Sequence, residues 1–290
     1  MEERRVIVHA AVVLLAAIAL GACATTTEEG TVGVQRSQLL LVSSAEMDQA
    51  AAAQYQQLIQ SATPKGAVNH DPKQVERVRR IANRLIPQTA VFRKDALDWK
   101  WEVNVLTSPE VNAWCMPGGK IAVYTGLIEK LQITDDELAA VMGHEISHAL
   151  REHGRERASQ QLATQMGASA VGAVLGIGQT GTDLAGLAGQ VTYLLPYSRI
   201  HETEADRMGV ELAARAGYDP RAAITLLWLA SRSSLRSAAR TEARCSRARC
   251  PFWTSTATLL RLGPRLLVQR QDLLGELGQV LDAGLVRGVS

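Results

Sequence analysis

The sequence predicts a mainly helical fold with a small β part beside one central helix. Residues 134–154 form a helical pattern with a clear start and stop, and residues 99–124 carry strand-like alternation and a turn. Much of the chain before them is rich in Ala, Leu and Gln, which favour helices. A chain of 290 residues can bury a substantial core.

Composition narrows the class of partner. The formal net charge is +2 and 47% of the residues are hydrophobic. A nucleic-acid-binding surface normally requires a clear basic excess. We therefore expect no nucleic-acid partner.

Residues 1–22 are predicted to be a lipoprotein signal peptide. Two arginines precede an apolar run over residues 6–20, which at about 15 residues is shorter than the roughly 20 that a spanning helix needs. The run ends in L-G-A-C, which resembles a bacterial lipobox and makes Cys23 the lipidated residue. The alternatives are an ordinary cleaved signal and an uncleaved N-terminal anchor. Because Ala24 follows, not aspartate, that resemblance implies a lipid anchor in the outer membrane, facing the periplasm.

Residues 23–65 are expected to form a lipid-anchored tether and an N-terminal helix. Residues 24–33 are largely polar, and residues 34–60 are helical in character. A loop rich in proline and glycine follows. Asp71 then caps the next helix, which has Pro72 at its first position.

The central helix contains the pattern His-Glu-Ile-Ser-His. It begins with a capping box at Thr134, and Gly154 is its expected stop, which leaves the nearby His153 in solvent. His144 and His148 are four residues apart on one helix face and can point at one ion. Glu145 is rotated by about 100° from His144 and can reach a metal-bound water. This is the H-E-x-x-H signature of a zinc peptidase.

A second pattern, H-E-T-E-A-D, supplies the third ligand. Catalytic zinc keeps three protein ligands, and Glu202 is the candidate, for one zinc ion per chain. Asp206 shares its helix face and is expected to orient a ligand histidine. Glu204 is expected to be solvated or paired with arginine, and His201 to be a second-shell or surface residue. Alternatively, Glu202 belongs to a solvated acidic face.

The β part offers a candidate substrate edge. Residues 99–105 alternate as a half-buried strand, and two more strands flank the turn at residues 117–119. A strand beside a zinc helix can bind an extended peptide by strand addition. The expected edge residues are Asn112, Ala113, Trp114 and Cys115. Alternatively these strands only support the core. Cys115 is read as a small packed side chain.

Residues 165–190 are rich in Gly, Ala and Ser and are too short and glycine-rich for a membrane span. One interpretation is a packed helix followed by a loop. The other is a mobile or membrane-proximal lid over the site.

The two motifs, the segment NAWCMPGGKIAVYTGLI and the later AGYDP together resemble the HtpX/CAAX-prenyl-protease family of zinc metallopeptidases. The similarity covers residues 34–230 and is greatest to the periplasmic lipoprotein branch of BepA-like and Loi-like proteins. It implies an α+β, mainly helical gluzincin fold with a small β-sheet beside the HExxH helix. It also implies Glu145 as base, His144, His148 and Glu202 as zinc ligands, and Asp206 behind them.

We therefore expect a zinc metallopeptidase domain over residues 66–230 and an atypical region rich in Arg, Ser and Ala over residues 231–290. Members of the family carry a Ser/Thr-His-Pro segment after the second motif, whereas no histidine follows His201 here. The last region is either frame-shifted or disordered, or genuinely divergent. Cys245 and Cys250 could form a disulfide in an oxidising compartment.

Two functions follow. The first is a zinc endopeptidase that hydrolyses misfolded or unassembled cell-envelope proteins. The second is a zinc-bearing envelope chaperone or assembly factor with little proteolysis, because the C-terminal histidine element is missing.

Overall fold

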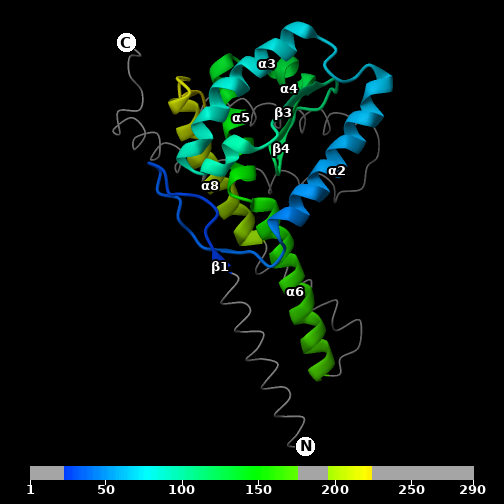
Figure 1. Cartoon of the computed structure of the whole chain (residues 1–290), viewed down its shortest axis with the longest axis vertical. Helices are drawn as coiled ribbons and strands as arrows, with labels where there is room; N and C mark the ends of the chain where they lie inside the picture. Colours follow the sequence, from blue (N-terminus) through cyan, green and yellow to red (C-terminus); the bar gives the residue numbers. More distant parts are fainter. Residues whose placement is uncertain (1–22, 176–194, 224–290) are drawn as a thin grey trace, which may run out of the picture.

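The computed structural model of the protein describes residues 23–175 and 195–223. The signal peptide, the second part of the glycine-rich segment and the C-terminal region with Cys245 and Cys250 lie outside these residues. The described helices are α2 (Ser44–Ala62), α3 (Pro72–Leu85), α4 (Thr125–Leu131), α5 (Asp135–Leu150), α6 (His153–Leu175) and α8 (Leu195–Arg215). Short 3-10 helices cover η1 (Thr63–Lys65), η2 (Ile86–Val91) and η3 (Lys94–Asp98). The mainly helical fold is confirmed (Figure 1).

A three-stranded sheet lies beside α5. It consists of β3 (Glu102–Leu106), β5 (Lys120–Tyr124) and β4 (Ala113–Met116), in the order β3-β5-β4. β3 is parallel to β5, and β4 is antiparallel to β5. The hairpin between β4 and β5 turns at Gly118 and Gly119, whose φ values of +74° and +81° favour glycine. The predicted strands and turn are therefore confirmed, except that the first strand begins at Glu102 and not at Trp99. β4 is an edge strand.

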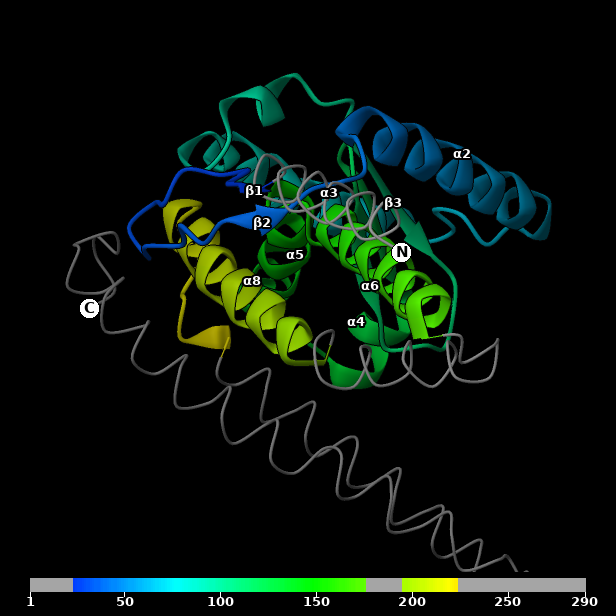
Figure 2. The ribbon, with the colours of Figure 1, turned by 90° about the horizontal axis from the view of Figure 1, so that it is seen from below.

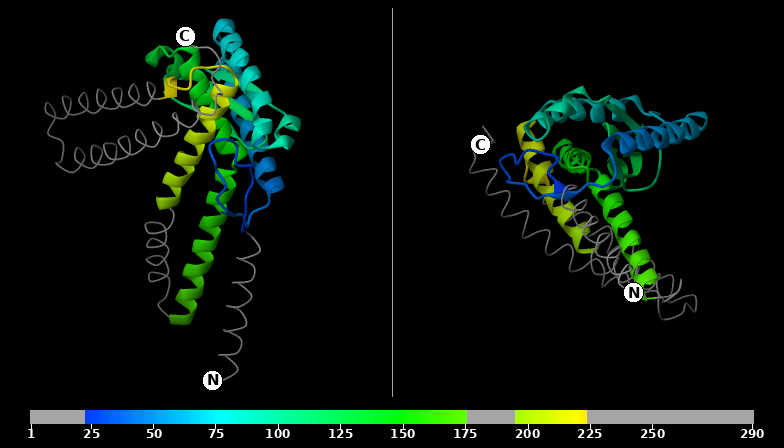
Figure 3. Two further views of the ribbon diagram at one scale, coloured as in Figure 1. Left: turned by 90° about the vertical axis from the view of Figure 1, so that its left-hand side faces the viewer. Right: turned by 60° about the horizontal axis from the view of Figure 1, so that its bottom comes forward.

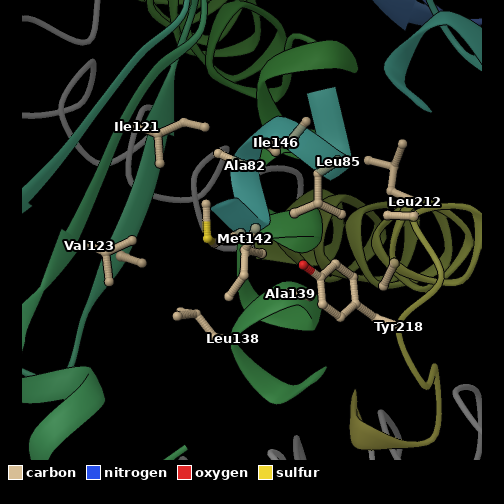
Figure 4. Packing of buried hydrophobic residues seen from close by; sticks show 14 of the residues in the cluster. Ala82, Leu85, Ile121, Val123, Leu138, Ala139, Met142, Ile146, Leu212 and Tyr218 are labelled. Carbon is tan, nitrogen blue, oxygen red and sulfur yellow. The ribbon is translucent and has the colours of Figure 1, made fainter. Parts of the chain in front are cut away.

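The apolar core lies between α3, β5, α5 and α8. Figure 4 shows Leu85 of α3, Val123 of β5, Met142 of α5 and Leu212 of α8 meeting there. The side chains of all four are fully buried. This layer holds α5 rigidly, so the residues on its opposite face are presented by a fixed backbone.

The two helices that carry the motifs cross at a pair of glycines. A Cβ placed on Gly209 of α8 would lie 2.6 Å from the backbone nitrogen of His144, and one on Gly143 would lie 2.7 Å from the Gly209 carbonyl oxygen. Both distances are too short for a side chain. The absence of side chains at these two positions therefore lets α8 approach the backbone of the motif helix.

The start of α5 agrees with the sequence and its end does not. The hydroxyl of Thr134 accepts a hydrogen bond from the Glu137 backbone, and the Glu137 carboxylate accepts one from the backbone of Thr134. The helix stops at Leu150, and Glu152 then adopts a left-handed conformation with φ +51°. Because the chain turns here, α6 begins at His153, and Gly154 is inside its first turn and not a stop.

The segment before α2 is not a solvated tether. Residues Cys23–Ala24 (β1) and Gln38–Leu39 (β2) pair as a small antiparallel sheet. Between them, Val32 and Val34 are 3% and 4% exposed. The segment lies beside α8 and α6 (Figure 2). The expected tether is therefore wrong for these residues, because their side chains and amides bond to the helices that carry the site.

Helix α6 extends away from the body of the protein (Figure 3). It covers the first part of the glycine-rich segment. The helix of the first interpretation is thus confirmed up to Leu175. Its packing is not, because residues 165–170 are mostly exposed. In the described part of the chain, no helix combines the length and apolar character needed to cross a membrane.

Candidate metal centre

Three predicted ligands converge on one point. Helix α5 supplies His144 and His148, and the first half of α8 supplies Glu202. One ligand atom from each lies within 4.8 Å of the others. The Nε2 atoms of the two histidines are 3.0 Å apart, and the Glu202 carboxylate oxygens lie 3.5 Å from His144 Nε2 and 3.8 Å from His148 Nε2.

These spacings suit a tetrahedral cation. Two ligand atoms about 2.0–2.1 Å from a tetrahedral zinc are about 3.3 Å apart. The three observed separations fall on both sides of that value. Two imidazoles and one carboxylate are also the donor set of several catalytic zinc sites, with the fourth position left for water. The side chains therefore fit the metal that the sequence predicts.

Asp206 lies directly behind the first ligand. Its carboxylate is 2.8 Å from His144 Nδ1, so it can accept that proton and leave Nε2 free for a metal. Although burial opposes it, hydrogen bonding to Asp206 and Glu202 raises the pKa of His144. The pKa of Glu202 is lowered to about 2 by the two ligand histidines, again against the effect of burial. The site thus concentrates negative charge where a cation would bind.

Glu145 lies in a cleft of about 400 Å³ beside the ligands. The cleft is lined by all three candidate ligands, by Glu145 and by residues of β4. Burial, with a contribution from the nearby Glu202 carboxylate, raises the pKa of Glu145 to about 7. A carboxylate with such a pKa can both accept and return a proton near neutral pH.

The predicted edge residues border the same cleft. Asn112, Ala113 and Cys115 line it, together with Met116 and Pro117. Trp114 does not line it and instead packs edge-to-face against Tyr55 of α2. Burial raises the pKa of the Cys115 thiol well above its usual value. The thiol is therefore uncharged, as expected for a packed side chain.

The family model of peptidase family M48 matches residues 72–270, which are more than half of the chain. The chain belongs to peptidase family M48. The match includes every residue of the metal centre and extends over residues 231–270, which are part of the C-terminal region predicted to be atypical.

Several curated proteins are similar to this M48 chain. The mitochondrial metalloendopeptidase OMA1 of Arabidopsis thaliana is 40% identical over 126 residues, which are 43% of this chain and 25% of that protein. The Schizosaccharomyces pombe protein of the same name is 34% identical over 153 residues, 51% of this chain and 42% of that protein. The β-barrel assembly-enhancing protease of Yersinia pestis is 27% identical over 160 residues, 53% of this chain and 32% of that protein. The M48 chain thus spans less than half the length of these relatives, and together they support a metalloendopeptidase.

The M48 chain has a further histidine at the site, one that was predicted to lie in solvent. His153 is fully buried, and its Nδ1 lies 2.9 Å from Nδ1 of the ligand candidate His148. Its Nε2 lies 3.0 Å from the Glu204 carboxylate. Burial lowers the pKa of His153 to about 4. The prediction was wrong because it continued one helix to Gly154, whereas the turn at Glu152 redirects His153 toward the site.

Glu204 belongs to a buried ion cluster, which we define as Arg36, Arg151, His153, Glu156, His201 and Glu204. Glu204 is 6% exposed and bonds to both arginines, so its predicted pairing with arginine is confirmed. His201 is 1% exposed and its Nε2 lies 3.0 Å from Glu156, which excludes the surface alternative. Arg36 joins the cluster across a long sequence separation, and no local pattern announced it.

Proposed function

We propose that the chain is a zinc-dependent endopeptidase of the gluzincin type, with His144, His148 and Glu202 as ligands. The observation that carries this proposal is the convergence of these three side chains at tetrahedral spacing. Glu145 lies beside them in a cleft bordered by an edge strand. A zinc ion held there would polarise a peptide carbonyl and lower the pKa of a water molecule to about 7.

Each of the chain's own residues at the site then has a separate role. Glu145 accepts the proton of the attacking water and returns it to the leaving amine. Asp206 keeps His144 in the tautomer that exposes Nε2. The edge formed by Asn112 and by residues 113–115 of β4 aligns an extended substrate through its backbone. Such alignment places the scissile bond near the metal without demanding one sequence.

We further propose that the substrates are misfolded or unassembled cell-envelope proteins. A bacterial relative bears the name β-barrel assembly-enhancing protease, which supports this substrate class. Other relatives are named as mitochondrial proteins, so the sequence features of the N-terminus carry the cellular location. Cleavage of the signal and lipidation of Cys23 would attach the chain to the outer membrane from the periplasmic side. Cys23 is exposed at the start of β1, where a modifying group has room.

The test is cleavage of an unfolded protein, such as reduced and alkylated casein, by the purified chain loaded with zinc. Cleavage should stop with a chelator and return with added zinc. Glu145→Gln should bind one zinc ion per chain and cleave at least 1000-fold more slowly, because it retains the ligands and loses the base. Equal cleavage by this variant would refute the assignment. Binding of the unfolded protein without cleavage by the unsubstituted chain would instead support a zinc-bearing chaperone or assembly factor.

A further inference from the structure

Each ligand histidine faces a choice of tautomer. An imidazole binds metal only through a nitrogen that carries no proton, so a histidine that offers Nε2 must carry its proton on Nδ1. That proton needs an acceptor in a buried site. Asp206 is the acceptor for His144. Among the described residues, no carboxylate bonds to Nδ1 of His148.

The atom that faces His148 Nδ1 is Nδ1 of His153, at 2.9 Å. Two ring nitrogens at this distance can bond only if one carries the proton and the other accepts it. The direction is set at the far side of His153, where Nε2 lies 3.0 Å from Glu204. An ionised carboxylate only accepts, so the proton of His153 is on Nε2 and its Nδ1 is the acceptor.

We propose that His153 and Glu204 are positioning residues that fix His148 in its metal-binding tautomer. The chain of bonds runs from the Glu204 carboxylate through the two ring nitrogens of His153 to His148 Nδ1. It serves the second ligand as Asp206 serves the first. The proposal rests on the proposed function only in taking His148 as a ligand through Nε2.

Glu204 is itself held in place. Arg36 donates to both of its carboxylate oxygens at 3.0 Å, and Arg151 donates to both at 3.3 Å. Both carboxylate oxygens therefore already accept from guanidinium groups, so Glu204 also acts as the acceptor toward His153 Nε2, and this fixes the direction of the relay. Burial restricts the Glu204 side chain further, since that side chain is only 9% exposed.

The chain offers a matched control. His201 stacks on His153 with ring centroids 4.4 Å apart, is equally buried, and also bonds through Nε2 to a glutamate, Glu156. Among the described residues, it makes no hydrogen bond or ring contact with His144, His148 or Glu202. His201→Phe therefore removes a buried, hydrogen-bonded histidine and keeps an aromatic ring stacked on His153, and it removes no hydrogen bond of the relay.

The affinity test compares zinc dissociation constants of the full chain, measured by competition with a chromophoric chelator. His153→Phe should weaken zinc binding by about 10–100-fold, as is usual for the partner of a ligand histidine. His153→Asn should recover part of this loss, because Asn Oδ1 lies near the position of Nδ1 and can accept from His148. His201→Phe should change affinity less than threefold. Equal affinities for His153→Phe and the unsubstituted chain would overturn the proposal, as would equal losses in the Phe and Asn variants.

A second measurement uses the unsubstituted chain and so does not depend on the folding of a variant. Long-range ¹H–¹⁵N spectra of the zinc-loaded chain distinguish histidine tautomers. His153 should carry its proton on Nε2 and His148 on Nδ1; the reverse assignment for His153 would refute the relay. If the unsubstituted chain binds no zinc, or if His148→Ala leaves zinc binding unchanged, the proposed function fails first. Zinc binding that depends on His148 but not on His153 refutes the relay alone.

Discussion

Replacing Arg36 with methionine should destabilise the protein although the residue lies far from α8 in sequence. Its guanidinium makes four hydrogen bonds to two buried carboxylates: two to Glu156 at 2.6 and 2.9 Å, and two to Glu204 at 3.0 Å. Removing one partner of a buried ion pair costs about 3–5 kcal/mol. We expect the lower end, about 3 kcal/mol, because Arg36 is 25% exposed and Arg151 and Gln38 remain bonded to the carboxylates.

The assay is urea unfolding of the metal-free protein, supported by thermal unfolding. A loss of about 3 kcal/mol corresponds to a fall in Tm of roughly 6–12 °C for a domain of this size. Arg80→Met is the control. It breaks a pair with Asp135 whose side chains are 55% and 42% exposed, which should cost less than about 1 kcal/mol. If the two variants lose the same stability, the buried cluster does not contribute as argued.

Three further predictions follow from the same contacts. The hydrogen bonds from Arg36, His201 and Gln38 hold the pKa of Glu156 well below its usual value of 4.5, against the effect of burial. The stability that Glu156 contributes is therefore present above about pH 4.5 and should decline as the pH falls below that value. Acid unfolding curves should show a weaker decline in Arg36→Met. Gly209→Ala should cost about 1–3 kcal/mol and weaken zinc binding by pushing α8 off the motif helix, whereas Gly167→Ala, with nothing within 4 Å of the new Cβ, should be neutral or slightly stabilising in the same unfolding and competition measurements. Zinc at 100 times its dissociation constant should raise the free energy of unfolding by about 2.7 kcal/mol, and a chelator, or Glu202→Gln at the same zinc concentration, should remove most of that gain.

The local parts of the structure could be predicted from the sequence. The capping box at Thr134 and the Asp71–Pro72 start are chemical signals carried within four residues, and both caps are formed. The i, i+4 spacing of His144 and His148 fixes their common face on any helix. The parts that failed depend on distant neighbours or on one dihedral angle. His153 is buried because Glu152 adopts a left-handed conformation. Glycine or asparagine at that position would have indicated such a conformation, but glutamate does not.

The prediction for the N-terminal segment failed for a different reason. Residues 24–33 are polar, and polarity usually indicates solvent. Here polar groups of the backbone bond inside the protein: the amides of Thr31 and Val32 donate to the buried Glu211 carboxylate. A local pattern cannot distinguish a polar segment that bonds to water from one that bonds to a helix about 180 residues later.

That long separation has a consequence for the order in which the protein is made. Arg36 cannot meet Glu204, nor Thr31 meet Glu211, until about 170–180 more residues have been synthesised. At about 5–20 residues per second, this delay is about 10–35 seconds. The H-E-x-x-H motif is complete only at His148, so for the next 54 residues, or about 3–11 seconds, it lacks its proposed third ligand Glu202 and the Glu204 carboxylate behind its proposed second ligand. A nascent chain of this protein therefore holds no assembled hydrolytic centre, and competence arises only when its early and late segments join.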